Sequence, residues 1–458
     1  MLLRLHVRGF KNLKDVDVRF GPLTCFVGPN GVGKSNMFDA IQFLRALADN
    51  DIQTAAQSVR SPQSGAFGPR ELVWGGAGNQ TMAFTADMIV PERVHDDFGR
   101  LAEPTTTLLR YEVEFRCADN PVPRLELVRE QLVGLKAGDA KSTIGFPHTP
   151  TFRRSAVKPT RRVGPLISTK EEGDTIAVML HQDGGSRGQP IPAGVSPRTV
   201  VGGTNAAEYP TVMAARREMA SWQLLQLEPS EMRAPDRIGG PDRVSERGGH
   251  IAAALARLAS VESSPGRTMA DAANRLAELV PEVKSLSIDR DEARQQISFQ
   301  ASMRGASRSL GPRSLSDGTL RFLALVTLQM DPTSCGVLCM EEPENGMHPS
   351  RIPAMVKLLR DFVVDAEEPI GPDNPARQVV VNTHSPDVVR QLSLGEVVFV
   401  ETVDGPDGRS ARVAAIKDGW RKEGALVPRK YVEDFMGGAP LSPEMGQLNL
   451  PLVIGSAQ

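Results

Sequence analysis

The chain has 458 residues, of which 40% are hydrophobic and 24% are charged. This ordinary globular composition excludes a wholly disordered chain, and the length predicts about three domain-sized units or one large α/β body with insertions. The 53 Lys and Arg residues nearly balance the 55 Asp and Glu residues, giving a net charge of −2. A global attraction to nucleic acid or to an anionic membrane is therefore excluded, and any such binding must be local.

The four cysteines, Cys25, Cys117, Cys335 and Cys339, are too sparse for a disulfide framework and form no CxxC pair. Charges within the opening MLLRLHVR interrupt the apolar run that a signal peptide needs, and no stretch approaches 18 apolar residues. We therefore expect reduced, packed thiols and a soluble cytoplasmic protein without membrane contact.

Residues 2–8 and 15–20 alternate apolar and polar side chains, and residues 23–27 (LTCFV) form a continuous apolar run. These patterns predict two partly exposed strands and one buried strand. From residue 34 to about 49, apolar side chains recur at helical spacing. The predicted order is strand, glycine-rich loop, helix.

Residues 80–135 carry alternating patterns separated by turn residues, which predicts an antiparallel meander. Residues 136–208 are rich in Gly, Pro, Ser and Thr and show weak periodicity, except at 174–180. This composition indicates an insertion with long loops.

Further regular elements are expected in the second half of the chain: helices at 211–222, 249–260 and 268–280, then a strand pair at 283–289 and 295–302. Thr268 and Asp271 form a helix start signal for the third helix, and Pro281 ends it. No heptad pattern persists long enough for a coiled-coil arm.

A phosphate-binding loop follows the buried strand. Its sequence fits G-x-x-x-x-G-K-[ST] at every required position, and we assign to nucleotide binding Gly28, Pro29, Asn30, Gly31, Gly33, Lys34, Ser35 and Asn36. The glycines let successive N–H groups point inward, and the helix N-terminus adds positive potential. In such a loop Lys34 reaches the β- and γ-phosphates, and the Ser35 hydroxyl ligates Mg²⁺. A chance glycine turn is the alternative, which the flanking strand and helix disfavour.

A second chemical signal lies at residues 337–342 (VLCMEE), where an apolar run ends in paired carboxylates. In a P-loop enzyme the first carboxylate holds the Mg²⁺ shell and the second orients or deprotonates water. This assigns Glu341 to the metal and Glu342 to water. A solvated strand end would look the same, but the nearby LSDGT at 315–319, which leads into a helix-like run, strengthens the assignment.

With these motifs in place, the sequence resembles the ABC-type ATPase heads of the RecF and SMC group. It is most similar to compact ATPases related to the N-terminal half of OLD nucleases and to the ATPase subunits of PARIS-type and Septu-type anti-phage systems. RGFKNLKDVDVRFGPLTCFVGPNGVGKSN resembles the first strand pair and Walker A of that group, and LSDGTLRFLAL its signature. MEEPENGMHP resembles its Walker B and D-loop, and VVVNTHSPDVV its switch-histidine strand. Motif-bearing segments cover about 1–50 and 210–400.

The resemblance implies roles for further residues. His384 is expected near the γ-phosphate, and Ser316 and Gly318 of the signature are expected to cover the ATP of a second subunit. His348 falls in the D-loop region, where a dimer contact is implied and an exposed loop histidine is the alternative.

The sequence departs from the commonest ABC pattern at three places. Glu341 stands where Asp is usual, and Asp317 and Thr319 replace the usual Gly and Gln of the signature. The third departure is the glutamine loop, for which the sequence offers only Gln80 as a candidate.

The expected fold is α/β: a P-loop ABC-type head with a mixed sheet, an antiparallel β lobe and an inserted loop and helical region. We expect an N-terminal ATPase lobe at 1–135, an insertion at 136–245 and a C-terminal ATPase lobe at 246–458.

The resemblance implies an Mg²⁺-dependent ATPase that forms a homodimer or higher oligomer through ATP-bridged heads. It would control a nucleic-acid-related process or a separately encoded effector such as a nuclease, in anti-phage defence. The alternative is a RecF-type DNA-repair ATPase that clamps DNA, and an ABC transporter subunit fits the motif wording less well. The stretch after His384 is too short for the Toprim nuclease domain of OLD proteins.

Residues 141–170 contain no Asp or Glu, and their basic residues are Lys141, Arg153, Arg154, Lys158, Arg161, Arg162 and Lys170. Such a segment could follow a phosphate backbone or bind an acidic partner. A solvated charged loop is an equal alternative, because Phe146 and Phe152 are the only aromatic residues available for stacking on bases.

Overall fold

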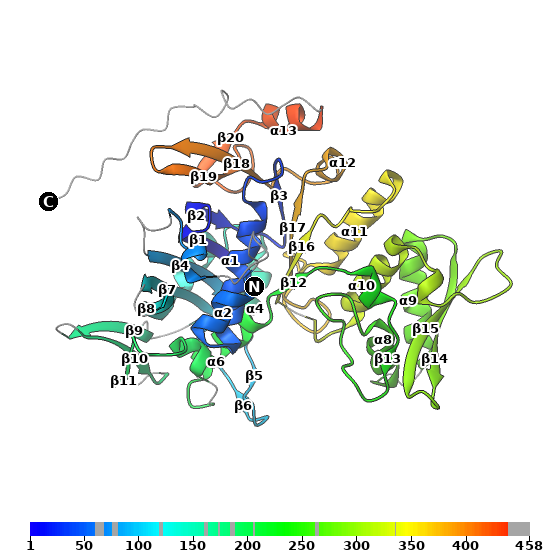
Figure 1. The fold of residues 1–458 in the computed structure, drawn as a ribbon, viewed down its shortest axis with the longest axis horizontal. Helices are drawn as coiled ribbons and strands as arrows, with labels where there is room; N and C mark the ends of the chain where they lie inside the picture. Colours follow the sequence, from blue (N-terminus) through cyan, green and yellow to red (C-terminus); the bar gives the residue numbers. More distant parts are fainter. Residues whose placement is uncertain are drawn as a thin grey trace.

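The computed structural model describes residues 1–59, 68–75, 81–118, 122–159, 164–172, 175–183, 188–204, 207–261, 265–334 and 336–437. Its strands form two large sheets and two small ones. Figure 1 shows the larger sheet on one side of the molecule, the second sheet through the centre and a helix-rich region on the other side.

The central seven-stranded sheet carries the predicted nucleotide loop. In spatial order its strands are β12 (Gln223–Leu225), β16 (Gly336–Glu341), β17 (Arg377–Thr383), β3 (Leu23–Val27), β18 (Val397–Gly405), β19 (Gly408–Ile416) and β20 (Ala425–Val427). The first five run parallel, and β19 returns antiparallel to β18. Strands β3 and β17 are buried along their whole length, as continuous apolar runs predict. The carboxyl ends of β3, β16 and β17 therefore meet at one edge of the sheet.

The eight-stranded sheet is antiparallel and contains the predicted meander. In spatial order its strands are β11 (Gly188–Pro192), β10 (Thr175–His181), β9 (Pro165–Glu172), β8 (Arg124–Gly134), β7 (Leu108–Ala118), β4 (Thr81–Ile89), β1 (Leu2–Phe10) and β2 (Leu13–Arg19). The first two strands of the chain confirm the alternation read from the sequence. A short hairpin, β5 (Val94–His95) with β6 (Leu101–Ala102), projects between β4 and β7 in the chain.

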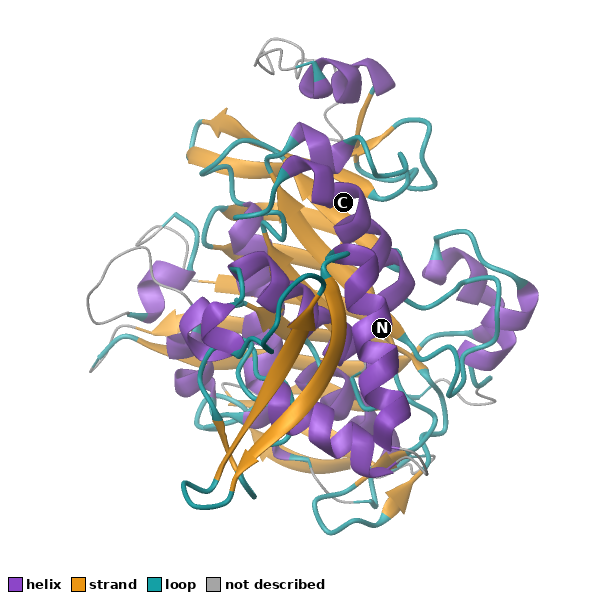
Figure 2. Cartoon of the chain, turned by 90° about the vertical axis from the view of Figure 1, so that its right-hand side faces the viewer, coloured by secondary structure: helices purple, strands orange, loops and turns teal. Residues whose placement is uncertain are grey.

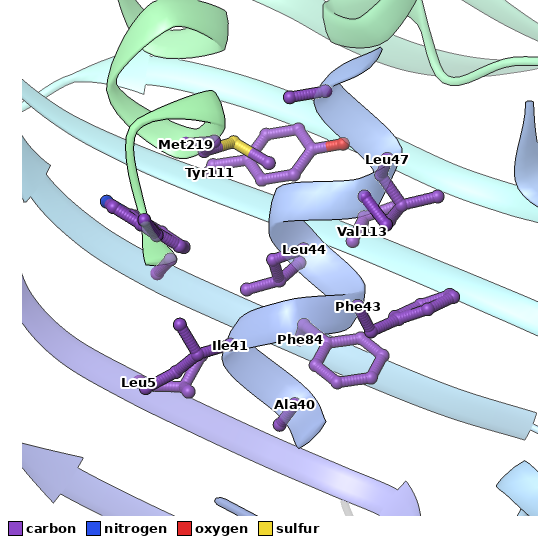
Figure 3. Packing of buried hydrophobic residues seen from close by; sticks show 14 of the residues in the cluster. Leu5, Ala40, Ile41, Phe43, Leu44, Leu47, Phe84, Tyr111, Val113 and Met219 are labelled. Carbon is purple, nitrogen blue, oxygen red and sulfur yellow. The ribbon is translucent and has the colours of Figure 1, made fainter. Parts of the chain in front are cut away.

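Helix α1 (Lys34–Asp49) packs against both large sheets. Its buried side chains belong to a single apolar core that also contains side chains from the eight-stranded and the seven-stranded sheet. Figure 3 shows Phe43 and Leu44 of α1 packed over the strands that carry Leu5 and Phe84. Phe43 and Leu44 are fully buried, and burial of each such side chain is worth roughly 1.5–3 kcal/mol. The orientation of the loop that precedes α1 is thus fixed by this core.

The opposite face of the central sheet packs against helices in a second core. These elements are α8 (Ile251–Val261), α9 (Pro265–Leu279), α10 (Asp317–Met330) and α11 (Ile352–Phe362), with the small sheet β13 (Asp236–Arg237), β15 (Gln296–Met303) and β14 (Val283–Asp291). Figure 2 looks onto this side, where the β14–β15 hairpin lies in front of the helices. The predicted strand pair is confirmed.

One helix boundary was predicted wrongly. The sequence signal at Thr268 and Asp271 placed the start of the third helix at 268, whereas α9 begins at Pro265. Proline is favoured in the first turn of a helix because its missing N–H needs no partner there. Thr268 is instead buried within the helix.

The prediction of long loops over 136–208 is also wrong. The described part of this segment contains β9, β10 and β11, which complete the eight-stranded sheet, and the short helices α3 (Ala140–Ile144), α4 (Pro150–Ala156) and α5 (Val200–Gly203). Strand pairing uses backbone groups, so strands at a sheet edge can carry Ser, Thr, Gly and Pro without losing their ladder. The division into 1–135, 136–245 and 246–458 stays a prediction.

The remaining helical elements are α2 (Ile52–Ser58), α6 (Pro210–Ala220), α7 (Pro229–Met232), α12 (Pro386–Val389), α13 (Arg429–Met436) and the 3₁₀ turns η1 (Pro69–Leu72), η3 (Ala137–Asp139), η4 (Pro312–Ser314) and η5 (Pro349–Arg351). Within the described ranges, none of the helices combines the length and apolar character needed to cross a membrane. Cys25, Cys117 and Cys339 are buried, and Cys335 lies outside the described residues.

Candidate functional site

The loop between β3 and α1 needs glycine for steric reasons that the structure makes explicit. A Cβ on Gly28 would lie 2.2 Å from the carbonyl oxygen of Val400. Gly31 and Gly33 have φ angles of 79° and 111°, in the left-handed region that favours glycine. A Cβ on Gly33 would also meet the side chain of Asn12 at 2.5 Å. The glycines thus allow a tight phosphate cradle against β18 and the β1–β2 turn.

Lys34 is held by the loop that it is expected to serve. Its side chain is buried, and Nζ donates to the carbonyl oxygens of Gly28 at 2.6 Å and Pro29 at 2.7 Å. Burial lowers the pKa of this ammonium group from its usual value, and the nearby Glu342 carboxylate opposes that shift. Phosphate oxygens are stronger acceptors than neutral carbonyls, so Lys34 is placed to exchange these two contacts for contacts with a nucleotide.

The paired carboxylates lie at the end of β16. Glu342 adopts a left-handed backbone conformation with φ 43°, which is costly for a residue with a side chain. Its N–H group donates to both the backbone oxygen of Asn382, at 3.1 Å, and the side-chain Oδ1, at 3.0 Å. These contacts from β17 hold the strained position.

Both oxygens of Glu342 have partners. Oε1 lies 2.8 Å from Nδ1 of His384, and Oε2 accepts from Nδ2 of Asn345 at 2.8 Å. The carboxylate is therefore fixed in orientation between His384, which follows β17, and Asn345, in the loop that follows β16.

Ten residues line one cavity of about 410 Å³: Asn30, Gly31, Gly33, Lys34, Ser35, Asn36, Glu341, Glu342, Asn345 and Asn382. The structure thus brings together most of the residues that the sequence assigned to nucleotide and metal. Gly28 and Pro29 contribute through their contacts with Lys34, and His384 through Glu342.

The cavity suits ATP with Mg²⁺ on the chemistry of its donors. The left-handed glycines and the N-terminus of α1 provide a cradle for phosphate. Ser35 and Glu341 both line the cavity, and a hydroxyl with one carboxylate leaves the other positions of Mg²⁺ for phosphate oxygens and water, as this ion prefers.

The signature loop lies elsewhere. Ser316 immediately precedes α10 and is its N-cap, because its Oγ accepts from the N–H of Thr319 at 3.2 Å. Ser316 and Gly318 do not line the described cavity. Figure 1 shows α1 and α10 on opposite sides of the central strands, in agreement with their membership of different cores. The structure therefore does not bring the signature residues to the nucleotide loop of the same chain.

Three residues of the site were missed by the sequence analysis. Asn382 contacts both acidic residues: its oxygens accept from the backbone N–H of Glu342, and its Nδ2 lies 3.4 Å from Oε1 of Glu341. Asn345 holds Glu342, and the buried Glu344 accepts from the hydroxyl of Thr383. Burial raises the pKa of Glu344 above its usual value. The sequence shows only that Asn382 follows the apolar run 379–381. The parallel register that sets it beside Glu341 is visible only in the structure.

Other predicted residues stay outside the cavity or outside the described chain. His348 is exposed and caps η5, so its dimer contact stays a prediction. Gln80, Arg161 and Arg162 lie outside the described residues. Phe146 and Phe152, considered above as stacking aromatics, are buried in a small core and are not available to bases.

Two family models match the chain. One, described as an AAA ATPase domain, matches residues 1–69. The other, described as an AAA domain, putative AbiEii toxin, Type IV TA system, matches residues 225–390. Together they include the Walker A, signature, Walker B and switch-histidine segments.

Curated relatives match over short segments. The OLD nuclease of Thermus scotoductus is 44% identical over 63 residues, 14% of this chain and 11% of the relative. The RecF DNA replication and repair protein of Bacteroides thetaiotaomicron is 36% identical over 64 residues, 14% of this chain and 17% of the relative. The matches thus span well under a fifth of each relative's length.

Solved structures with similar architecture include an Smc head bound to the C-terminal winged-helix domain of ScpA, with a TM-score of 0.48 and 12% identity over 91% of this chain and 98% of that one. The Thermotoga maritima SMC head has a TM-score of 0.37 and 13% identity, over 90% of this chain and 97% of that one. Because both TM-scores are below 0.5, the assignment of this chain as an ATPase depends on the family models, the sequence relatives and the loop geometry. The family models and the sequence relatives support an ATPase similar to RecF and OLD proteins, as the sequence predicted.

Proposed function

We propose that this protein is an Mg²⁺-dependent ATPase switch in which ATP joins two copies head to head and hydrolysis separates them. The observation that carries the proposal is the division of the site. The Walker A loop and both carboxylates line one cavity, while Ser316 and Gly318 lie at the start of α10, across the central sheet. A second copy, related by a two-fold axis, would supply its signature loop to this cavity and receive the same in return.

Within each cavity, the bound nucleotide supplies the reacting phosphoanhydride and Mg²⁺ supplies charge neutralisation. Lys34 would bind the phosphates, and Ser35 with Glu341 would hold the metal. Glu342 would orient the attacking water and accept its proton. His384, released from Glu342, would donate a hydrogen bond to the γ-phosphate. The movement of His384 would then couple the presence of the γ-phosphate to the end of β17.

The biological process that this ATPase switch would control is inferred from the relatives. The match to an OLD nuclease and to a family described as a putative toxin of a toxin–antitoxin system supports a role in anti-phage defence. The switch would then act on a nucleic-acid-related process or on a separately encoded effector such as a nuclease.

A DNA-clamping ATPase of RecF type is the second candidate, supported by the RecF relatives. If it applies, neutralising the exposed Arg154 together with Arg153 on α4 should reduce the salt dependence of DNA binding by roughly one unit of slope for each phosphate that the protein no longer neutralises. An unchanged slope would remove α4 as a DNA-binding element.

The dimer itself is tested by sedimentation velocity. The Glu342→Gln variant with ATP and Mg²⁺ should sediment as a dimer, and the same protein with ADP should sediment as a monomer. A monomer under both conditions, with ATP binding confirmed by titration, would contradict the proposal.

A further inference from the structure

The signature loop contains an ion pair that the ATPase motifs do not explain. Nη2 of Arg233 donates to Oδ1 of Asp317 at 2.5 Å and to the backbone oxygen of Leu315 at 3.1 Å. Arg233 therefore contacts the residue on each side of Ser316. The Asp317 side chain is 52% exposed and that of Arg233 is 27% exposed. The pair therefore lies at the protein surface, beside the N-terminus of α10.

Arg233 reaches this loop from a fixed support. It follows α7, whose last residue, Met232, is buried in the second core. The N–H group of Arg233 donates to the backbone oxygen of Pro229 at 3.1 Å, which closes the turn. Helix α7 packs against α10. The guanidinium is consequently held beside the start of α10. An ion pair on an open surface contributes little stability, because fixing a long side chain in one geometry costs entropy.

Without Arg233, the net charge at the N-terminus of α10 would disfavour the approach of a polyphosphate. The N-terminus of a helix carries the equivalent of about half a positive charge, which would attract a polyphosphate. Asp317, the first residue of α10, adds a full negative charge and reverses that sign. The Arg233 guanidinium cancels the carboxylate and restores a net positive potential at the loop.

We propose that Arg233 is a positioning residue that compensates the charge of Asp317 and so lets the signature loop approach ATP held by a second copy. This inference rests on the proposed ATP-bridged dimer, because only there does the loop meet a triphosphate. Arg233 acts through Asp317 and Leu315, and ATP binding to the Walker side of the same chain does not involve it.

The test is a double-mutant cycle on the dimer dissociation constant, measured by sedimentation equilibrium with ATP and Mg²⁺ in the Glu342→Gln background. Arg233→Ala should weaken the dimer on the order of 10- to 100-fold, because an unpaired like charge then faces the nucleotide. Asp317→Asn should leave the dimer at least as tight. The combination of both changes should return the constant to within about threefold of the reference.

Two controls separate charge from shape. Arg237→Ala removes an exposed arginine from the same subdomain and should leave the constant within about threefold. Arg233→Lys keeps the charge with fewer N–H donors and should retain most of the dimer. ATP affinity in dilute, monomeric protein should be unchanged in every variant.

Each other result has a defined meaning. If the combined variant dimerises as weakly as Arg233→Ala, or if Arg233→Lys is as weak as Arg233→Ala, Arg233 only shapes the loop and charge compensation is wrong. An Arg233→Ala dimer of reference strength overturns the inference and leaves the proposed function intact. If the reference protein does not dimerise with ATP, the proposed function fails first, and the inference fails with it.

Discussion

The Glu342 carboxylate and the His384 ring lie 2.8 Å apart, although 42 positions separate the two residues in the chain. Parallel pairing of β16 with β17 places their carboxyl ends side by side, in a register that matches Glu341 with Asn382. The proposed water-activating group and the proposed γ-phosphate sensor are thus joined directly. A ligand that draws His384 away must also change the environment of Glu342.

The two carboxylates should be separable by substitution. Glu342→Gln keeps the side-chain shape but removes the proton acceptor, so ATP hydrolysis should fall about 10²- to 10⁴-fold while ATP binding persists. Glu341→Gln should instead raise the Mg²⁺ concentration needed for half-maximal activity. Steady-state ATPase assays over a Mg²⁺ series measure both. Wild-type turnover in Glu342→Gln would assign the base to another residue.

Lys34→Ala should weaken ATP binding at least about tenfold, because hydrogen bonds to charged groups are worth roughly 1.5–3 kcal/mol. Calorimetric titration measures the affinity directly. The exposed Lys417→Ala removes the same charge away from the cavity and should bind ATP normally. Equal affinities in both variants would make the P-loop assignment wrong.

Asn382→Ala should lower the turnover number by about tenfold or more and change ATP affinity by less than about threefold. The variant loses the side-chain acceptor for the Glu342 N–H and the amide beside Glu341, so both carboxylates lose orientation. Asn274→Ala, an exposed change on α9, is the matched control. An Asn382→Ala enzyme with normal turnover would show that the backbone contacts suffice.

A buried carboxyl on β8 should make stability depend on pH. Oε2 of Glu130 accepts from the N–H of Val200 at 2.6 Å, and Oε1 accepts from the N–H of Val201 at 2.8 Å and from the hydroxyl of Tyr111 at 3.1 Å. Burial raises the pKa of Glu130 from 4.5 to about 7.

Between these two values the folded state keeps a proton that the unfolded chain has released. The free energy of unfolding contributed by Glu130 is therefore greatest below pH 4.5 and falls as the pH rises to about 7, by roughly 3 kcal/mol in total. Urea unfolding of wild type and Glu130→Gln at pH 5 and pH 8 measures this: the advantage of wild type over the variant should shrink at pH 8. A constant difference would show that Glu130 keeps an ordinary pKa.

The parts of the fold that sequence patterns predicted well are those where burial repeats regularly. The run LTCFV and the helical spacing after it gave β3 and α1 with the observed bounds, because both elements are packed on their apolar faces. Strands β9 and β11 were missed because their sequences show no regular apolar alternation, although backbone hydrogen bonds pair β9 with β8 and β10, and β11 with β10.

The site shows the same limit. Residues in the contiguous P-loop motif could be assigned from spacing alone, since the loop and helix positions fix their geometry. Asn382, Asn345 and Arg233 could not, because their roles depend on which strands and helices become neighbours in space. The left-handed conformation of Glu342 was equally invisible in the sequence.

The most direct test of the ATP-bridged dimer is complementation between two inactive proteins. Ser316→Arg should retain ATP binding at its own Walker side but block closure on the partner, and Glu342→Gln should close without hydrolysis. In a mixed dimer one composite site carries both defects and the other carries neither. We predict that ATPase activity partly returns when the two are mixed, with subunit exchange verified independently. No recovery despite exchange would contradict the account, because it would mean that the signature acts within its own chain or that both sites must be intact.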